Sequence, residues 1–164
     1  MATFTFWSTD FTQQLDIPKY KVDNLLTQIK RAEKKIFARN EVLDFDLELK
    51  KRNTNLAIVL DCSSLSGIAA VASYLIYART QKTVLLHKVC TLEDYRRRGI
   101  AKALVQMYLN RLKGQGCKKI HLWVDEANIS ARYLYASVGF DGVDRVEDYY
   151  CPGRNGIRMI FDPD

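Results

Sequence analysis

The sequence predicts a mixed α/β fold, in which a mostly antiparallel sheet is flanked by helices and contains one parallel pair of strands. Three observations predict it. Apolar, β-branched runs typical of strands occur at both ends and in the centre of the 164-residue chain. Two longer segments instead have apolar residues at helical spacing. Between residues 84 and 124 a strand, a helix and a strand follow one another, which is the order of a parallel, right-handed crossover.

The first half of the chain is expected to combine two helices with three strands. Phe4 and Phe6 alternate with threonines, as in a short strand. Residues 22–37 keep helical spacing, with lysines and an arginine on the remaining surface. Asn40 is expected to cap a second helix that ends near residues 51–53. The further expected elements are strands at 56–60 and 68–78, joined as an antiparallel hairpin by the turn at 63–67.

The second half supplies the crossover and a terminal hairpin. A strand at 84–91 leads into the arginine turn 96–99, and the following helix is expected to stop at the glycines of 114–116. The remaining expected elements are a strand at 120–124, a helix at 128–138, and strands at 142–150 and 156–161.

Length and composition predict one globular domain over residues 1–164, as a monomer or a homodimer. No apolar run approaches the roughly 20 residues that span a bilayer. The N-terminus lacks a secretory pattern, so the expected location is the cytoplasm, with the nucleus possible, and no membrane partner is expected. The four cysteines show no C-x-x-C pair, which indicates no metal site. The net charge of +6 is spread among acids without a nucleic-acid reader motif, so no nucleic acid is expected.

The arginine turn predicts a phosphate site. We expect residues 96–101 to form the first turn of the helix that follows. The N–H groups of a first turn lack partners within the helix, and the macrodipole is positive there. Small residues at 99 and 101 would let a pyrophosphate approach the main chain. A solvated basic turn is the alternative interpretation. The residues expected on this first turn are Arg96, Arg97, Arg98, Gly99, Ile100 and Ala101.

Two motifs resemble those of the GNAT superfamily of acetyl-CoA-dependent N-acetyltransferases. Arg96, Gly99 and Ala101 match its pyrophosphate pattern Q/R-x-x-G-x-G/A. Its second pattern, N-x-x-A-x-x-L-Y-x-x-x-G-F, is matched by Asn128, Ala131, Leu134, Tyr135, Gly139 and Phe140. The resemblance implies a GNAT fold whose two parallel strands splay apart to admit the pantetheine arm. It also implies acetyl-CoA as the acetyl donor, without a metal.

The resemblance also implies roles for individual residues. Tyr135 matches the tyrosine that protonates the departing coenzyme sulfur, and a phenol with a pKa of about 10 suits that task. His87, on the strand that enters the site, resembles the base of the arylalkylamine branch. A packed tyrosine and a buried core histidine are the structural alternatives. The implied cofactor-binding residues are Val89, Cys90, Thr91, Arg96, Arg97, Arg98, Gly99, Ile100, Ala101, Lys102, Asn128, Ala131 and Tyr135.

The end of the chain bears on the amine that accepts the acetyl group. Tyr149 and Tyr150 resemble the tyrosine pair that borders the peptide groove of ribosomal-protein and protein N-terminal acetyltransferases, although cross-strand packing would also explain them. His121 and Trp123 are further candidate substrate contacts. The predicted reaction is direct attack, in a ternary complex, by an N-terminal α-amine or a lysine of a peptide or protein. A polyamine or arylalkylamine acceptor stays open, as does a module that binds coenzyme A without catalysis.

Overall fold

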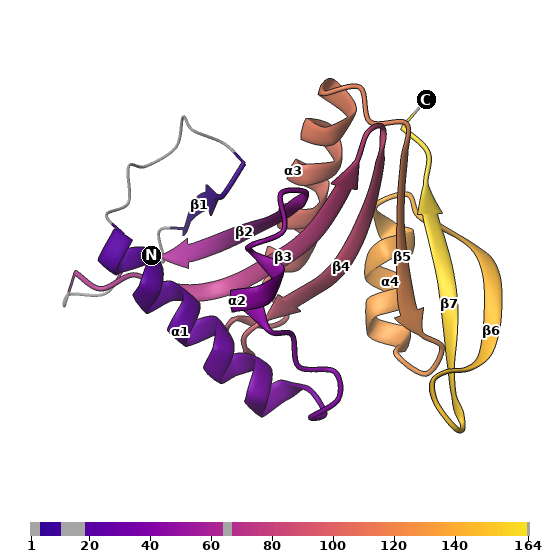
Figure 1. Cartoon of the computed structure of the whole chain (residues 1–164), viewed down its shortest axis with the longest axis horizontal. Coiled ribbons are helices and arrows are strands. Elements are labelled where there is room, and N and C mark those ends of the chain that lie inside the picture. The colour runs from indigo at the N-terminus through magenta and orange to yellow at the C-terminus, as the bar shows by residue number, and fades with distance from the viewer. Residues whose placement is uncertain (1–3, 11–18, 64–66, 164) are drawn as a thin grey trace. The chain divides into compact units, whose positions relative to one another are not determined.

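The computed structural model describes residues 4–10, 19–63 and 67–163. Its strands are hydrogen-bonded in the order β1-β2-β3-β4-β5-β7-β6 as a seven-stranded sheet. The β1–β2, β5–β7 and β6–β7 pairs are antiparallel and the β4–β5 pair is parallel, which confirms the predicted mixed sheet. The elements (Figure 1) are β1 (Phe4–Ser8), α1 (Lys19–Ile36), α2 (Phe45–Glu48), β2 (Thr54–Asp61), β3 (Ala70–Thr80), β4 (Thr83–Thr91), η1 (Glu93–Tyr95), α3 (Ile100–Gly114), β5 (Lys119–Asp125), α4 (Ile129–Ser137), β6 (Asp141–Cys151) and β7 (Arg154–Phe161).

The chain divides into two compact units. Unit 1 comprises Met1–Ile76 and Val89–Ile100, and unit 2 comprises Tyr77–Lys88 and Ala101–Asp164. Strands β3 and β4 contribute residues to both units. The single domain expected over residues 1–164 stays a prediction. Among the residues that the structure describes, no helix has the length and apolar character needed to cross a membrane.

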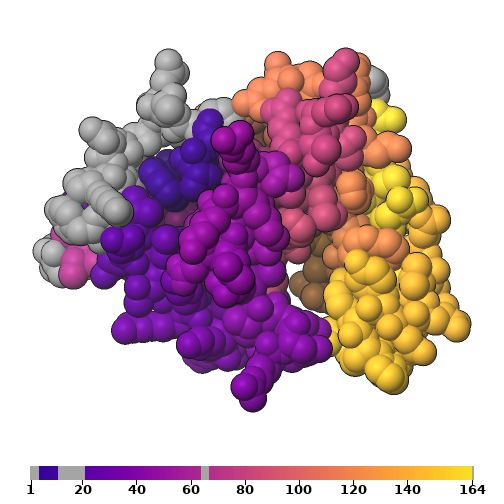
Figure 2. All heavy atoms as spheres, viewed as in Figure 1, coloured from indigo at the N-terminus to yellow at the C-terminus, as the bar shows by residue number. Residues whose placement is uncertain are grey.

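Unit 1 is built on the amphipathic helix α1 and the strands it covers. The apolar side of α1 is buried, as its spacing predicts. In the space-filling view the side chains of α1 and α2 form much of the near surface of this unit (Figure 2). The buried side chains that form its core are Leu25, Ile29, Phe45, Leu56, Ile58, Leu60, Val71, Tyr74, Ile76 and Cys90.

A buried acidic side chain lies in this unit, on α1. Glu33 is fully buried, although it lies on a helix otherwise rich in exposed lysines. Its Oε1 accepts a short hydrogen bond from the Tyr74 hydroxyl, and its Oε2 accepts one from the Leu43 N–H at 3.1 Å. Burial, together with the nearby Cys90 and Glu33, raises the pKa of Tyr74 far above its usual range. These bonds give both side-chain oxygens of the buried Glu33 a partner and tie the loop after α1 to β3.

The second helix differs from the expectation. Helix α2 has only four residues, and its N-cap is Asp44, not Asn40. A carboxylate oxygen of Asp44 accepts hydrogen bonds from the N–H groups of Asp46 and Leu47, each at 3.1 Å. Apolar residues at every second position from 43 to 49 do not form a sustained helical face, so a single turn is the result.

Unit 2 contains the crossover. Helix α3 ends at Gly114, as predicted, and its buried face packs around Leu104 and Tyr108. The buried and partly exposed residues of β5 alternate, which confirms the predicted strand. The parallel register runs from Thr83 opposite Lys119 to Leu86 opposite Leu122. Strand β4 continues from there to Thr91 and β5 to Asp125.

Candidate functional site

The arginine turn lies between η1 and α3 and not on the helix itself. The prediction that Arg96, Arg97, Arg98 and Gly99 sit on the first helical turn is wrong, because α3 begins at Ile100. Before that residue the backbone passes through the left-handed region at Arg97, with φ 59°, and at Gly99, with φ 73°. Residues at positive φ cannot continue a right-handed helix. The arginines are therefore presented by a tight turn that leads into the helix.

The main-chain N–H groups of this turn are available to a ligand. Among the described residues, none of the turn, loop and capping hydrogen bonds uses the amides of residues 97–102. These amides are consecutive in the chain and precede or open α3, where N–H groups lack helical acceptors and the macrodipole is positive. A run of such donors beside three guanidinium groups fits a pyrophosphate.

Two of the arginines also make contacts that hold the turn. The Nε of Arg96 donates to the carbonyl oxygen of Thr91 at 3.2 Å. The guanidinium of Arg98 lies 5.6 Å from the centre of the Tyr95 ring. The Tyr95 hydroxyl in turn donates to a carboxylate oxygen of Asp61 at 3.1 Å. The turn is thus anchored to the ends of β2 and β4.

Ser73 on β3 contacts the last two residues of β4, and sequence reasoning did not identify it. Its hydroxyl donates to the carbonyl oxygen of Cys90 at 2.8 Å and lies 3.0 Å from the Thr91 hydroxyl. Ser73 is fully buried. A serine within the apolar and aromatic run of β3 was the available signal, because buried polar groups require partners. The predicted coenzyme-binding residues Val89, Cys90 and Thr91 follow one another on this segment.

In unit 2, α4 carries the predicted acid. Tyr135 is 8% exposed, and its ring meets the edge of Phe140 at 5.8 Å between centroids. Burial raises the pKa of Tyr135 above its usual value of 10, and Tyr150 raises it further. The phenol therefore keeps its proton at neutral pH. Asn128 and Ala131, which are also predicted cofactor-binding residues, interact at the start of α4. The side-chain oxygen of Asn128 accepts a hydrogen bond from the Ala131 N–H at 3.1 Å and so caps the helix.

The two histidines of the sequence lie on β4 and β5 of unit 2. His87 is exposed, so it is not a buried core residue. His121 is partly buried, and its Nδ1 is buried without a hydrogen-bond partner among the described residues. Burial lowers the pKa of His121 below 6.5, and the positive charges of Arg158 and Lys119 and the nearby His87 lower it further. His121 is therefore mostly neutral near pH 7.

Three of the four predicted substrate contacts, Trp123 on β5 and Tyr149 and Tyr150 on β6, meet as an aromatic group. The rings of Trp123 and Tyr149 stack 4.2 Å apart at an interplanar angle of 15°, and Tyr150 meets Tyr149 edge-on at 4.9 Å. The guanidinium of Arg154 lies 5.2 Å from the centre of the Tyr150 ring. Two nitrogens of Arg154 bind Asp125 Oδ2, at 2.8 and 2.7 Å. Sequence reasoning missed this ion pair because its partners are 29 residues apart, without a local pattern.

The structure thus brings the predicted residues together in two sets. Unit 1 joins the end of β4 to the arginine turn. Unit 2 holds Tyr135, both histidines and the aromatic group. In that unit Tyr150 is near enough to raise the pKa of Tyr135, and His87 is near enough to lower the pKa of His121.

Known proteins are similar to this chain in sequence and in fold. Residues 21–140 match the model of the Acetyltransferase (GNAT) family. Over 73 residues the chain is 37% identical to the [Ribosomal protein bS18]-alanine N-acetyltransferase of Haemophilus influenzae, covering 44% of this chain and 49% of that protein. Over 68 residues it is 32% identical to N-alpha-acetyltransferase MAK3 of Arabidopsis thaliana, covering 42% of this chain and 36% of that protein. The matches thus span less than half the length of these curated relatives.

A crystal structure of the NatC complex bound to Gag peptide and CoA contains a similar chain. The TM-score is 0.75 at 18% identity, covering 97% of this chain and 98% of that one. At this identity the likeness shows a shared fold. The family match, which covers most of the chain, is consistent with the pyrophosphate turn and with the capped helix that carries Tyr135. The chain therefore belongs to the GNAT family of acetyltransferases.

Proposed function

We propose that this chain is an N-acetyltransferase that moves the acetyl group of acetyl-CoA to the amine of a peptide or protein. GNAT acetyltransferases use acetyl-CoA as the donor. The observation that carries the proposal is the run of amides at residues 97–102, which no turn, loop or capping hydrogen bond of the described residues uses. Together with Arg96, Arg97 and Arg98 it would hold the diphosphate of the coenzyme. The coenzyme would supply an acetyl group activated as a thioester.

The remaining chemistry is proton transfer by the chain's own side chains. Tyr135 keeps a proton on its phenol oxygen at neutral pH and would give it to the basic leaving group. An alkylamine is mostly protonated at neutral pH and must lose a proton before it attacks. One candidate proton acceptor is His121, which is mostly neutral at this pH and whose buried Nδ1 has no hydrogen-bond partner among the described residues. The other candidate is His87.

The aromatic group of unit 2 supports a peptide or protein acceptor. Stacked tyrosine and tryptophan rings offer an apolar wall, and Tyr149 is 42% exposed, so part of that wall is accessible. The relatives named for N-alpha-acetylation and for acetylation of a ribosomal-protein alanine act on protein N-termini, and the NatC structure holds a peptide. We therefore propose an N-terminal α-amine as the acceptor, with a lysine side chain as the next candidate.

A thiol-release assay with acetyl-CoA tests this proposal. The panel contains peptides with free N-termini, the same peptides with blocked N-termini and one lysine, a polyamine and an arylalkylamine. We expect release with the free N-terminal peptides. Release with the polyamine or the arylalkylamine alone would contradict the peptide acceptor. Coenzyme A binding without release on any amine would contradict catalysis and favour the non-catalytic module.

A further inference from the structure

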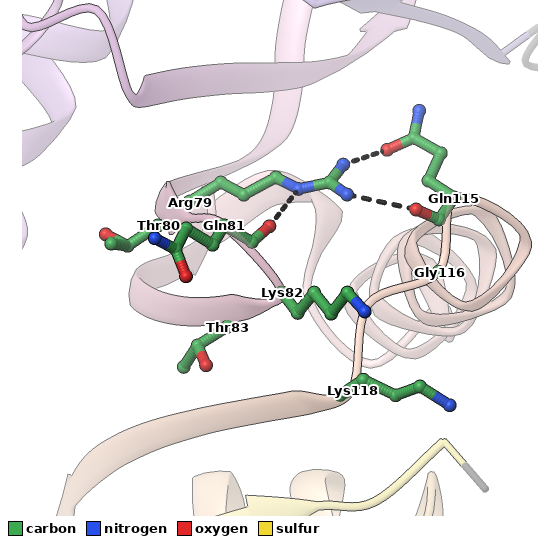
Figure 3. Close-up of a pocket in the computed structure, with 8 residues that line it drawn as sticks. All are labelled: Arg79, Thr80, Gln81, Lys82, Thr83, Gln115, Gly116 and Lys118. Carbon is green, nitrogen blue, oxygen red and sulfur yellow. Dashed lines mark hydrogen bonds between the residues drawn. The ribbon is translucent and has the colours of Figure 1, made fainter.

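A second cationic site lies in unit 2, at the hairpin between β3 and β4 and the connection from α3 to β5. The pocket there has a volume of about 680 Å³, within the range of small-molecule sites. Figure 3 shows its lining, which contains three cations, two amide side chains and two hydroxyls, and no carboxylate. The lining residues are Arg79, Thr80, Gln81, Lys82, Thr83, Gln115, Gly116 and Lys118.

The guanidinium of Arg79 is held in place before any ligand binds. Its Nε donates to the carbonyl oxygen of Gln81 at 3.3 Å, and its two terminal nitrogens donate to Gln115, at 2.5 Å to the side-chain oxygen and 3.1 Å to the carbonyl. These bonds use three of the five N–H groups, so each terminal nitrogen keeps one donor. A guanidinium fixed in this way loses little conformational entropy when it binds an oxyanion.

The backbone around the pocket is also fixed. The Lys118 N–H donates to the Lys82 carbonyl oxygen at 2.7 Å, which ties the β3–β4 turn to the start of β5. Gln81 and Gly116 take positive φ angles of 52° and 73°, so both connections are tight turns. In Figure 3 the side chain of Lys82, an exposed residue, points toward the connection between α3 and β5. The cations therefore project from two joined turns.

These cations also lie near the C-terminal end of α3, where positive charge stabilises a helix. Helix α3 ends at Gly114, and cations near a helix C-terminus offset a partial charge of roughly −0.5. Arg79 and Lys82 alone bring two full positive charges to the pocket. The helix end therefore neutralises only a small part of the charge. No ion pair among the described residues involves Arg79 or Lys82, so a positive field remains for a ligand.

We propose that this pocket binds a small polyphosphate anion, at a site distinct from the arginine turn. An oxyanion would accept the remaining N–H groups of Arg79 and the ammonium protons of Lys82, with the amides and hydroxyls of the lining as further donors. A chain of linked phosphates matches separated cations better than a single phosphate does, because each phosphate can face one of them.

NMR titration of the intact chain with inorganic triphosphate tests the site. The titration is made in saturating coenzyme A, because the arginine turn is itself a predicted phosphate site. We expect the largest amide shift changes at residues 79–83 and 115–118. Lys82→Gln should weaken this binding about tenfold, since it removes a charged hydrogen-bond donor. Arg79→Gln should weaken it at least as much.

Lys113→Gln is the matched control, because it removes one positive charge from an exposed residue that does not line the pocket. It should change the affinity less than twofold. Equal losses in the Lys82 and Lys113 variants would show a nonspecific charge effect and overturn the proposal. Shift changes confined to residues 96–102, or none at all, would overturn it too and leave the cations as caps of α3. Circular dichroism of each variant confirms that the fold is retained.

Discussion

Gly99 offers the sharpest test of the phosphate-binding turn. Its φ of 73° lies in the left-handed region, and a Cβ built there meets nothing within 4 Å. Gly99→Ala therefore adds no clash, and its cost is conformational, about 1–2 kcal/mol for a left-handed alanine. If the alanine relaxes toward a right-handed conformation, the N–H groups of the turn rotate away from their common direction. We expect the affinity for coenzyme A, measured by calorimetry, to fall about 5- to 30-fold.

Two other glycines separate this effect from a general loss of stability. Gly116 has the same φ of 73° and the same empty surroundings, so Gly116→Ala should cost a similar free energy of unfolding while the affinity for coenzyme A is kept. Gly114, which has no positive φ and equally open surroundings, should tolerate alanine without loss. Wild-type affinity for coenzyme A in Gly99→Ala, or an equal loss of affinity in Gly116→Ala, would refute this role of Gly99.

Three further predictions concern proton transfer and the core. Tyr135→Phe should lower turnover in the thiol-release assay about 100-fold without changing the affinity for coenzyme A. The control Tyr133→Phe changes a side chain on the same helix that is 76% exposed, and it should match the wild type. Equal turnover in the Tyr135→Phe variant and the wild type would exclude the acid role. Because the pKa of folded His121 lies below 6.5, the unfolded chain binds more protons, so stability should fall as pH falls from 7 to 5. His121→Gln should flatten that fall in urea titrations, and an unchanged slope would contradict it. Glu33→Ala leaves the buried Tyr74 hydroxyl without its acceptor and should cost about 2–4 kcal/mol in urea denaturation; a loss below about 1 kcal/mol would contradict the contact's importance.

Local patterns predicted most of the elements in the second half of the chain. Strand β5 alternates between buried and partly or fully exposed residues over its seven positions, and α4 follows a capping asparagine, so the local patterns predicted both elements. The first half was less predictable. Asp44 was preferred over Asn40 as a cap because the backbone there lets its carboxylate reach two N–H groups, which composition does not reveal.

The candidate site was likewise predictable from the sequence only in part. The residue types of the arginine turn and of the tyrosine helix were visible in the sequence because each motif is contiguous. The left-handed angle at Arg97, which displaces the arginines from the helix, was not visible, because non-glycine residues rarely adopt it. Ser73 and Asp125 act on atoms 17 and 29 residues away, respectively, and only the folded chain brings those atoms within reach.

By itself the sequence determined the order of the elements, the mixed sheet and the two motifs that mark the family, since each depends on neighbouring residues. The tertiary structure decided which polar groups are buried and which partners they have. It placed Glu33 against Tyr74, left Nδ1 of His121 buried without a partner among the described residues, and assembled the second cationic pocket from two turns. The physical reason is that burial and charge proximity depend on distances in space, and residues far apart in the chain set those distances.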